Sequence, residues 1–425
     1  MVSAPSGTPD SGPLLAELVR HEGARILATL VRTVGSWTVA EDAVQEAVLA
    51  ALRTWPRTGI PEDPRAWLGV AARRKAIDIL RREQARAGKE RQAGALLMLR
   101  DQPLEQVPDS TVRDDQLRLI FTCCHPALSL GNQVALALRT LCGLSLAQTA
   151  AVLLVSESAM AKRLTRTRQK ITVARIPYAV PGDADLPTRV TAVCGVVHAL
   201  FTAGHAPLGG ARVQDVDVCA EAARLARLVH QLMPDEAAPA AVLALILFSE
   251  SRRPARTDAN GDVVLLPVQD RSRWDGRLIA EAEALLAGSL RRTGGMADAY
   301  QLQAAIAAEH ARAGSYADTD WDEVVRLFGL LLSVAPSPAA ALARAVAVAE
   351  RAGPAAGLAA LAGLPEDHRL YAVRAELLAR QGHFEPAVAD GIRSLTGGLT
   401  EPERRFREAR LRAWRERLDA SPTDP

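Results

Sequence analysis

Hydrophobic positions recur at helical spacing along most of the chain. Apolar side chains fall three and four residues apart from Leu14 to about Glu83, and again from Thr111 to Thr172. The same period returns after Pro187, runs to about residue 251, and continues from Trp274 to near Leu418. This pattern predicts an all-α protein.

Stretches rich in proline, glycine and polar residues separate the helical parts. We expect residues 1–13 to be disordered, 87–109 to be a flexible linker, and Ile176–Pro187, with three prolines and a glycine, to mark a boundary. Residues 252–275 indicate a long loop with a turn at Asn260-Gly261 and a short extended piece. The expected domains are therefore 14–86, 110–175 and 185–418.

Composition supports the helical interpretation and indicates a compartment. Aromatic residues make up 4% of the 425 residues, and alanine, leucine and arginine are abundant, a mixture that favours helices over β-rich cores. We see no apolar run approaching the ~20 residues of a membrane span and no signal peptide at the N-terminus. Five cysteines, an odd number spread over a long chain, indicate thiols. We expect a cytoplasmic protein without a membrane partner.

Charge is distributed unequally between the two parts of the chain. Residues 1–177 contain 24 Lys/Arg and 17 Asp/Glu, a net of +7, and the remaining 27 basic and 32 acidic residues give −5. The basic first part predicts an anion-binding surface, with nucleic acid as the leading candidate.

The most informative segment is LSLAQTAAVLLVSESAMAKRLTRTRQKI, residues 144–171. Ser145 and Ser156 are each placed to cap a helix, and only Leu154 and Val155 separate the two helices. The second helix has Met160, Leu164 and Ile171 on a core-facing side and no acidic residue from 158 to 175. A solvated basic face is the alternative, but the turn, the caps and the basic face together favour a DNA-binding helix-turn-helix.

Two earlier segments carry a basic and an acidic helix face. PRAWLGVAARRKAIDILRREQAR begins at Pro64, and nine basic and three acidic residues lie between Arg65 and Arg91, as on a surface that follows phosphates. Its expected buried side is Trp67, Val70, Ala71, Ile77 and Leu80. AEDAVQEAVLAALRTWP, residues 40–56, has a core face made of Val44, Ala47, Val48, Ala51, Leu52 and Trp55. An acidic patch with one apolar member lies on another face of this helix.

In this order the three segments resemble the sigma family of bacterial RNA polymerase initiation factors, specifically the small extracytoplasmic-function (ECF) type. The resemblance covers about residues 14–172 and implies core RNA polymerase and promoter DNA as partners. It implies polymerase clamp contacts from Glu41, Asp42, Gln45, Glu46 and Leu49. It implies −10 contacts from Arg73, Arg74, Lys75, Asp78, Arg81 and Arg82, in a region-2 helical domain. It implies −35 contacts from Ser156, Ser158, Ala159, Lys162, Arg163 and Arg166, in a region-4 helix-turn-helix domain.

The last part of the chain contains a weak internal repeat of helix, glycine turn and helix. Gly314, Gly353 and Gly382 lie 39 and 29 residues apart, close on average to the ~34-residue period of tetratricopeptide (TPR) repeats. Phrases such as DRSRWD and YQLQAAIAAEHA resemble the TPR-like extension of one subgroup of these factors. The resemblance departs at Leu154, where the family commonly has glycine, and at the divergent segment 196–210. A generic helical bundle is the alternative.

No pattern in the sequence indicates catalysis. We find no Gly-rich phosphate loop, HExxH or GxSxG, and we expect neither an enzyme nor a cofactor. Cys123, Cys124, His125 and Cys142 include no CxxC pair, so we expect structural thiols and no metal site there. Further along the chain, Cys194, His198 and His205 lie in an apolar segment, and we interpret them as core residues.

Three functions remain open: a sigma factor, a one-component regulator with a ligand- or protein-sensing repeat domain, and a helical-repeat scaffold. The acidic helix at 41–55 disfavours the one-component regulator, which has no need of a region-2-like module. We expect residues 185–425 to control activity in cis or by recruiting a signalling protein, and a purely stabilising extension is the alternative.

Overall fold

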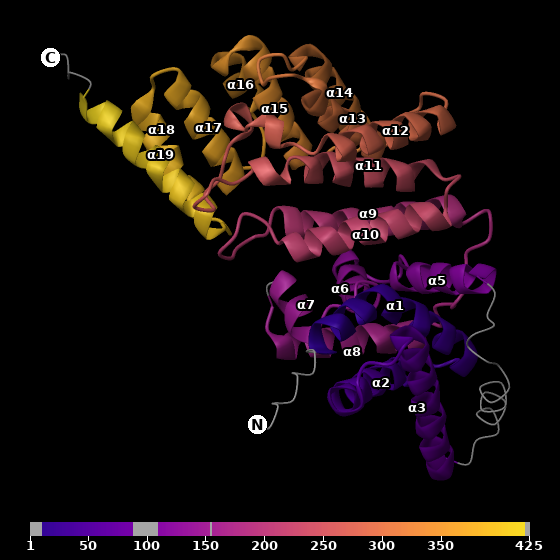
Figure 1. Ribbon diagram of the computed structural model, residues 1–425. Helices are drawn as coiled ribbons and strands as arrows, with labels where there is room; N and C mark the ends of the chain where they lie inside the picture. The colour runs from indigo at the N-terminus through magenta and orange to yellow at the C-terminus, as the bar shows by residue number, and fades with distance from the viewer. Residues whose placement is uncertain (1–10, 88–108, 154, 421–425) are drawn as a thin grey trace, which may run out of the picture. The chain divides into compact units, whose positions relative to one another are not determined.

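The computed structural model describes residues 11–87, 109–153 and 155–420, and in these ranges it contains helices and no β-strand (Figure 1). The chain divides into two compact units, Met1–Val196 and Val197–Pro425. The expected linker 87–109 lies outside the described residues except at its two ends, as do residues 1–10 of the expected disordered N-terminus. Ser11, Gly12 and Pro13 belong to the first helix, so the expectation of disorder is wrong for these three residues.

The first unit contains two groups of helices. The first group is α1 (Ser11–Val34), α2 (Trp37–Thr58) and α3 (Pro64–Ala87). The second group is α5 (Asp109–Cys123), α6 (Leu130–Thr140), α7 (Leu146–Val152) and α8 (Glu157–Val173). Helices α1, α2 and α3 pack against one another around Leu15, Ala51 and Trp55, and α5 packs against α1. Trp67 contacts this cluster edge-on, with its ring centroid 5.5 Å from that of Trp55, so its expected core position is confirmed.

The buried face of α3 differs from the expected one. Leu68, Ala72, Ala76 and Leu80 are fully buried, whereas Val70 is exposed. These four positions are spaced by four residues, and two of them are alanines, whose small side chains allow α3 to approach its neighbours closely. On α2, Leu52 is likewise exposed, and Ala43 occupies the core instead.

Helix α9 (Leu186–His205) contains the boundary between the two units. By length and composition it is apolar enough to cross a membrane, which corrects the expectation that no segment approaches that length. One such helix is weak evidence of a span, because core helices pass the same test. Val193, Val196, Val197 and Leu200 are buried, as in a core helix.

The second unit begins with a buried central helix. Helix α11 (Ala237–Ser251) is buried around most of its circumference and packs against α10 (Val216–Leu232), α12 (Gly276–Arg292) and α13 (Ala299–Arg312). The expected loop follows it and contains three single-turn 3₁₀ helices, η2 (Arg253–Ala255), η3 (Leu266–Val268) and η4 (Arg271–Arg273). An isolated bridge between Thr257 and Val263 encloses the expected turn, where Gly261 has φ +78°.

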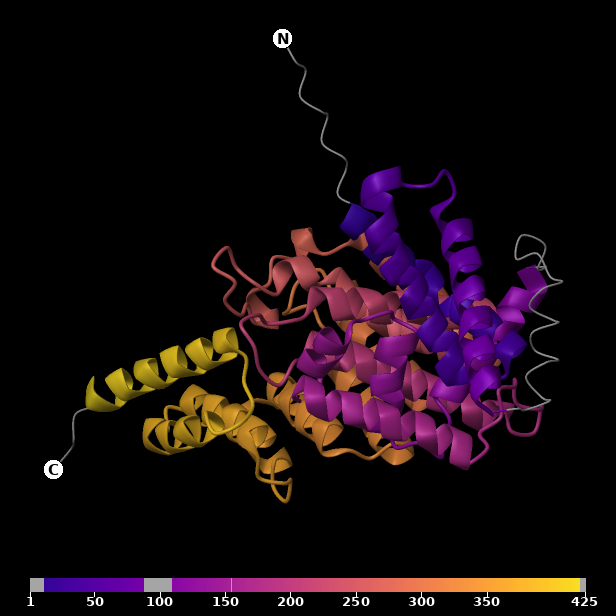
Figure 2. The same ribbon diagram turned by 90° about the horizontal axis from the view of Figure 1, so that it is seen from below.

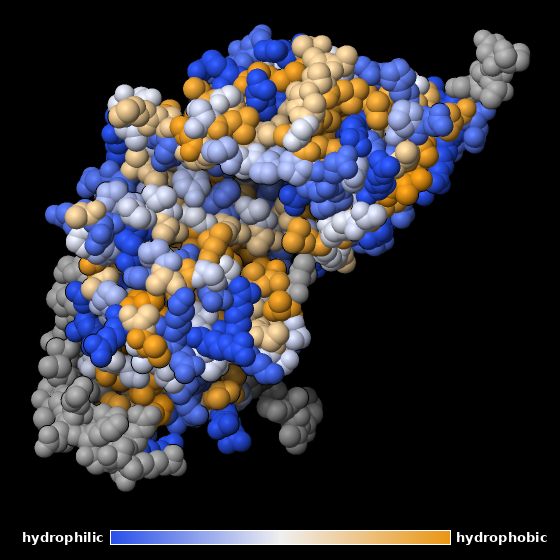
Figure 3. All heavy atoms as spheres, turned by 180° about the vertical axis from the view of Figure 1, so that it is seen from behind, coloured by the Kyte–Doolittle hydropathy of each residue, from blue (hydrophilic) through white to orange (hydrophobic). Residues whose placement is uncertain are grey.

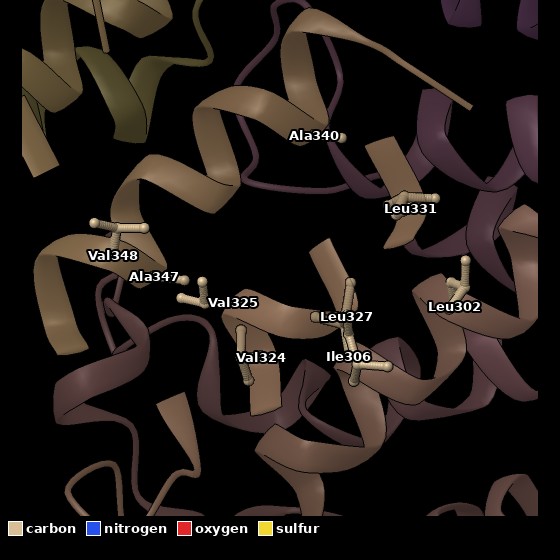
Figure 4. Close-up of a cluster of buried hydrophobic side chains, with 9 residues drawn as sticks. All are labelled: Leu302, Ile306, Val324, Val325, Leu327, Leu331, Ala340, Ala347 and Val348. Atoms are coloured by element: carbon tan, nitrogen blue, oxygen red, sulfur yellow. The ribbon is translucent and has the colours of Figure 1, made fainter. Parts of the chain in front are cut away.

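Helix pairs follow one another through the rest of the second unit (Figure 1). They are α13 with α14 (Trp321–Val334), α15 (Pro338–Ala352) with α16 (Pro354–Ala360), and α17 (His368–Arg380) with α18 (Phe384–Ser394). Figure 4 shows how α13, α14 and α15 share a cluster that includes Leu302, Val324 and Val348. Gly353 and Gly382 have positive φ, as turn glycines require, whereas Gly314 does not.

The last helix, α19 (Glu401–Ala420), lies beside α18 (Figure 2). Trp414 and Leu411 of α19 pack with Ala387 of α18 and Ala375 of α17, so the final helix covers an apolar face that the last pair leaves open. On the face of the molecule seen in Figure 3, hydrophilic and hydrophobic residues are interspersed, which is ordinary for a protein surface.

Candidate nucleic-acid interface

Serine caps define both helices of the helix-turn-helix. The Ser145 hydroxyl accepts a hydrogen bond from the Gln148 amide at 3.1 Å, and the Gln148 side chain accepts one from the Ser145 amide at 2.8 Å, which makes a capping box. The Ser156 hydroxyl accepts from the Ala159 amide at 3.2 Å and caps α8. Leu154, the departure from the family pattern, lies outside the described residues.

Three apolar residues anchor α8, and its opposite side is polar. Met160, Leu164 and Ile171 are buried as expected. Five of the six residues expected at the −35 element are exposed on the outer side of the helix or at its cap: Ser156, Ser158, Ala159, Lys162 and Arg166. Thr165 and Gln169, which are not in the expected set, are exposed on the same side and lie three residues after Lys162 and Arg166.

Arg163, the sixth residue of that set, has different surroundings. Its side chain is half-buried, and its Nε donates a hydrogen bond to Asn132 Oδ1 of α6 at 2.8 Å. A Cβ atom at Gly131 would lie 2.3 Å from Arg163 Nη2, so a residue without a side chain makes room for the guanidinium. Arg163 therefore connects α8 to the start of α6, which points to a positioning role.

The residues expected at the −10 element occupy more than one side of α3. Arg74, Arg81 and Arg82 are exposed. Arg73, Lys75 and Asp78 are half-buried, and Lys75 Nζ lies 3.6 Å from Glu46 Oε2 of α2. The exposed arginines form the part of this set that is open to a phosphate backbone.

The acidic patch on α2 is divided in the same way. Asp42, Gln45, Glu46 and Leu49 are exposed. Glu41 is only 9% exposed, because it forms an ion pair with Arg168 of α8, 127 residues away in the sequence. The structure thus places one of the expected polymerase contacts inside the first unit.

A groove runs along this part of α2. It has a volume of about 280 Å³ and is lined by α1, by α2 including Glu41, Gln45 and Leu49, and by the segment from Arg139 to Gly143. Asp42 and Glu46 do not line it. Three of the five expected clamp residues, Glu41, Gln45 and Leu49, thus come together in this groove.

Two further contacts join α1 to the second helix group. Arg32 Nε lies 2.8 Å from Asp115 Oδ2, and the Asp115 side chain is fully buried. The Tyr178 hydroxyl lies within hydrogen-bonding distance of the Ala28 and Asp115 carbonyl oxygens, at 2.8 and 3.1 Å. Burial, with Asp115 nearby, raises the pKa of Tyr178 well above its usual range. No local sequence pattern indicated these contacts.

All five cysteines are free and buried. Burial raises the pKa of the Cys124 thiol to about 12, and it raises the pKa of Cys123 well above its usual range, with Cys124 adding to the effect. Such protonated, enclosed thiols are unreactive.

Comparison with known proteins finds matches to both helix groups of the first unit. The model of sigma-70 region 2 matches residues 18–86, and that of sigma-70 region 4 matches residues 118–171. The ECF RNA polymerase sigma factor SigK of Mycobacterium sp. (strain KMS) is 29% identical over 112 residues, which cover 25% of this chain and 55% of SigK. SigK of Mycobacterium ulcerans (strain Agy99) is 27% identical over 135 residues, covering 29% of this chain and 71% of SigK. The first part of the chain therefore carries sigma-70 regions 2 and 4 and is similar to ECF sigma factors.

Another relative extends beyond these two sigma regions. An uncharacterized protein of Rhizobium meliloti (strain 1021) is 41% identical over 342 residues, 80% of each chain. Residues 189–290 of this chain match a family of unknown function, DUF6596. No solved structure gives a significant match. The expected domain boundaries and the TPR-like character of the extension stay predictions.

Proposed function

We propose that this sigma factor recognises −35 DNA through the exposed side of α8. The observation that carries the proposal is the coincidence of a serine-capped helix with an outer side holding Ser158, Lys162 and Arg166. Side chains near the N-terminus of such a helix reach base edges, while cations farther along contact phosphates. Arg74, Arg81 and Arg82 of α3 would contact −10 DNA, and Gln45 and Leu49 would meet the polymerase clamp along the groove.

Run-off transcription with purified core RNA polymerase tests this function. We expect the chain to convert core enzyme into a promoter-specific enzyme, and Lys162→Ala and Arg166→Ala to reduce the run-off product. A protein that binds DNA but gives no run-off product would instead be a one-component regulator, and a protein that does neither would be a scaffold.

We also propose that residues 185–425 regulate the sigma factor, in cis or by binding a signalling protein at the helical repeats. Support comes from the net charge of −5 after residue 177, which is opposite to the +7 before it, and from successive helix pairs of the kind that form interaction surfaces. Charge attraction of this kind is screened by salt. Truncation after Val196, with promoter output compared at equal protein level, tests this proposal.

A further inference from the structure

Two arginines lie against one tryptophan in the second unit. Arg252 directly follows α11, Arg271 begins η4, and Trp274 directly follows η4. The guanidinium carbon of Arg271 lies 4.5 Å from the centroid of the Trp274 ring, and that of Arg252 lies 5.7 Å from it. The Asp275 amide donates to the Ser251 carbonyl at 2.9 Å, which joins the two segments. Cation–π attraction thus holds both guanidinium groups beside the indole.

The two arginines lack a bonded counter-charge. Among the described residues, the guanidinium of Arg252 makes no hydrogen bond or ion pair. Arg271 donates through Nη1 to the backbone carbonyl oxygens of His310 and Ala313, at 2.6 Å each. Asp318 attracts Arg271 from farther than ion-pair distance. Uncharged carbonyl groups orient a guanidinium but do not neutralise it, so the pair keeps a positive charge that an anion would balance.

Three buried nitrogen atoms of the same cluster have no hydrogen-bond partner within the part of the chain that the structure describes. They are Trp274 Nε1, Arg271 Nη2 and His310 Nδ1. A buried polar atom without a partner costs free energy. The indole N–H and the guanidinium N–H can only donate hydrogen bonds. What these atoms require is therefore a group with several acceptor oxygens.

Repulsion between like charges in the cluster also favours an anion. Burial, together with Arg256 and Arg271, lowers the pKa of Arg252 to about 10. Burial, with Arg252 and Arg271 nearby, lowers the pKa of His310 to about 4. At pH 7 both arginines are therefore charged, and their repulsion is screened less in this half-buried place than in water. An anion would relieve the repulsion, whereas a metal cation would add to it.

The cluster brings together segments that lie apart in the sequence. The phrase DRSRWD contributes Arg271 and Trp274, and the phrase YQLQAAIAAEHA contributes His310. Arg252, Arg271 and His310 are half-buried, so the cluster is in reach of solvent. None of these residues belongs to the proposed DNA or polymerase contacts. The cluster is therefore a separate candidate site in the second unit.

We propose that Arg252, Arg271 and Trp274 bind the phosphate group of a small molecule. A phosphate monoester carries a charge of about −1.5 to −2 at pH 7 and has three strong acceptor oxygens. Two guanidinium groups and one indole N–H match both this charge and this number of acceptors. A carboxylate would balance only one of the two cations. The proposal does not depend on the proposed function.

Hydrogen exchange of the full-length protein, measured by mass spectrometry during a phosphate titration at constant ionic strength, tests this site. We expect inorganic phosphate and phenyl phosphate to slow exchange in η4 and at the end of α13, because a ligand stabilises the state that binds it. Acetate should not. This local readout also distinguishes the site from the basic helices of the first unit. Arg252→Gln and Trp274→Phe should each raise the dissociation constant for phosphate by at least about tenfold.

A matched control lies on η4 itself. Arg273→Gln changes an exposed arginine two residues after Arg271 and should bind phosphate like the parent. Equal protection by acetate, or equal weakening by Arg273→Gln, overturns the proposal. Unchanged exchange in the parent also overturns it, since water alone would then satisfy the buried nitrogen atoms. The unaltered protein thus decides the question even if a variant fails to fold.

Discussion

Two adjacent residues of α8 illustrate how neighbours in the sequence take different roles. Lys162 is exposed, whereas Arg163 is half-buried and bonded to Asn132. Lys162→Ala should therefore weaken promoter binding at every sequence and lower the salt slope by about 1, as loss of one phosphate contact does. Arg163→Ala should instead destabilise the first unit by about 1–2 kcal/mol, because it removes a charged hydrogen bond.

Fluorescence anisotropy across a salt series, with thermal unfolding of each variant, separates the two effects. Asn132→Ala is the matched control, since it removes the partner of Arg163 but leaves the guanidinium in place. If Arg163→Ala weakens DNA binding at unchanged stability while Asn132→Ala does not, Arg163 contacts DNA and the positioning role is wrong.

A half-buried histidine, His310, makes the second unit sensitive to pH. Burial, with Arg252 and Arg271 nearby, lowers the pKa of His310 to about 4. Above pH ~6.5 the ring is neutral in both folded and unfolded chains, so it has no effect. Between pH ~6.5 and 4 only the unfolded chain takes up the proton, so the free energy of unfolding falls as pH falls, by at most ~1.4 kcal/mol per pH unit.

Urea unfolding at pH 7, 6 and 5 measures this dependence, and His310→Gln should flatten the curve relative to the parent. His383→Gln is the control, because the side chain of His383 at the start of α18 is exposed. A parent protein whose stability does not change between pH 6.5 and 5, or an unaltered slope in His310→Gln, would contradict the prediction.

At the scale of single elements, the caps define the helix-turn-helix. Ser145→Ala removes the capping box of α7, and such a loss costs about 1 kcal/mol. Because α7 has only seven residues, we expect its amides to exchange hydrogen faster while those of α3 stay unchanged. Ser145→Asp should restore protection, since aspartate also caps. Equal exchange in Ser145→Ala and the parent, measured by mass spectrometry, would exclude the capping role.

The helices could be predicted from the sequence where the residues that define them lie close together in the chain. Ser145 and Ser156 predicted the starts of α7 and α8, and apolar spacing predicted the buried side of α8. The buried side of α3 was predicted less well, because Ala72 and Ala76 carry its packing and alanine gives little hydrophobic signal. The Glu41–Arg168 and Arg32–Asp115 contacts join residues far apart in the sequence, and no local pattern encodes them.

At the scale of a whole unit, the Glu41–Arg168 ion pair joins the sigma regions that sequence reasoning treated as separate. Removing one partner of a half-buried pair leaves the other without compensation. Arg168→Glu should therefore speed hydrogen exchange in α2 and α8, and the swap Glu41→Arg with Arg168→Glu should restore protection.

Run-off transcription of the same variants tells a structural role from a polymerase contact. If Glu41 also contacts the clamp, the swap restores protection but not transcription. Glu62→Arg, which changes an exposed carboxylate after α2 that is outside the expected clamp set, serves as the control for charge alone. Unchanged exchange in Arg168→Glu would show that the pair does not hold the two helices together.

At the scale of the whole molecule, the open question is whether the second unit regulates the first. Truncation after Asp183 removes the proposed regulatory part, but it also removes Arg189, whose Nη2 donates to the Phe121 carbonyl at 2.5 Å within the first unit. Truncation after Val196, at the end of the first unit, keeps that contact. Comparing the two truncations therefore separates loss of regulation from damage to the sigma regions.

At equal protein level, we expect promoter output from the Val196 truncation to change strongly, in either direction. An extension that restrains the sigma regions, or that recruits a signalling protein to them, must alter activity when it is removed. The Asp183 truncation should show the same change, plus any loss that comes from α9. Output equal to that of the full chain after the Val196 truncation would leave the extension without a regulatory role, and its helix pairs would then serve stability alone.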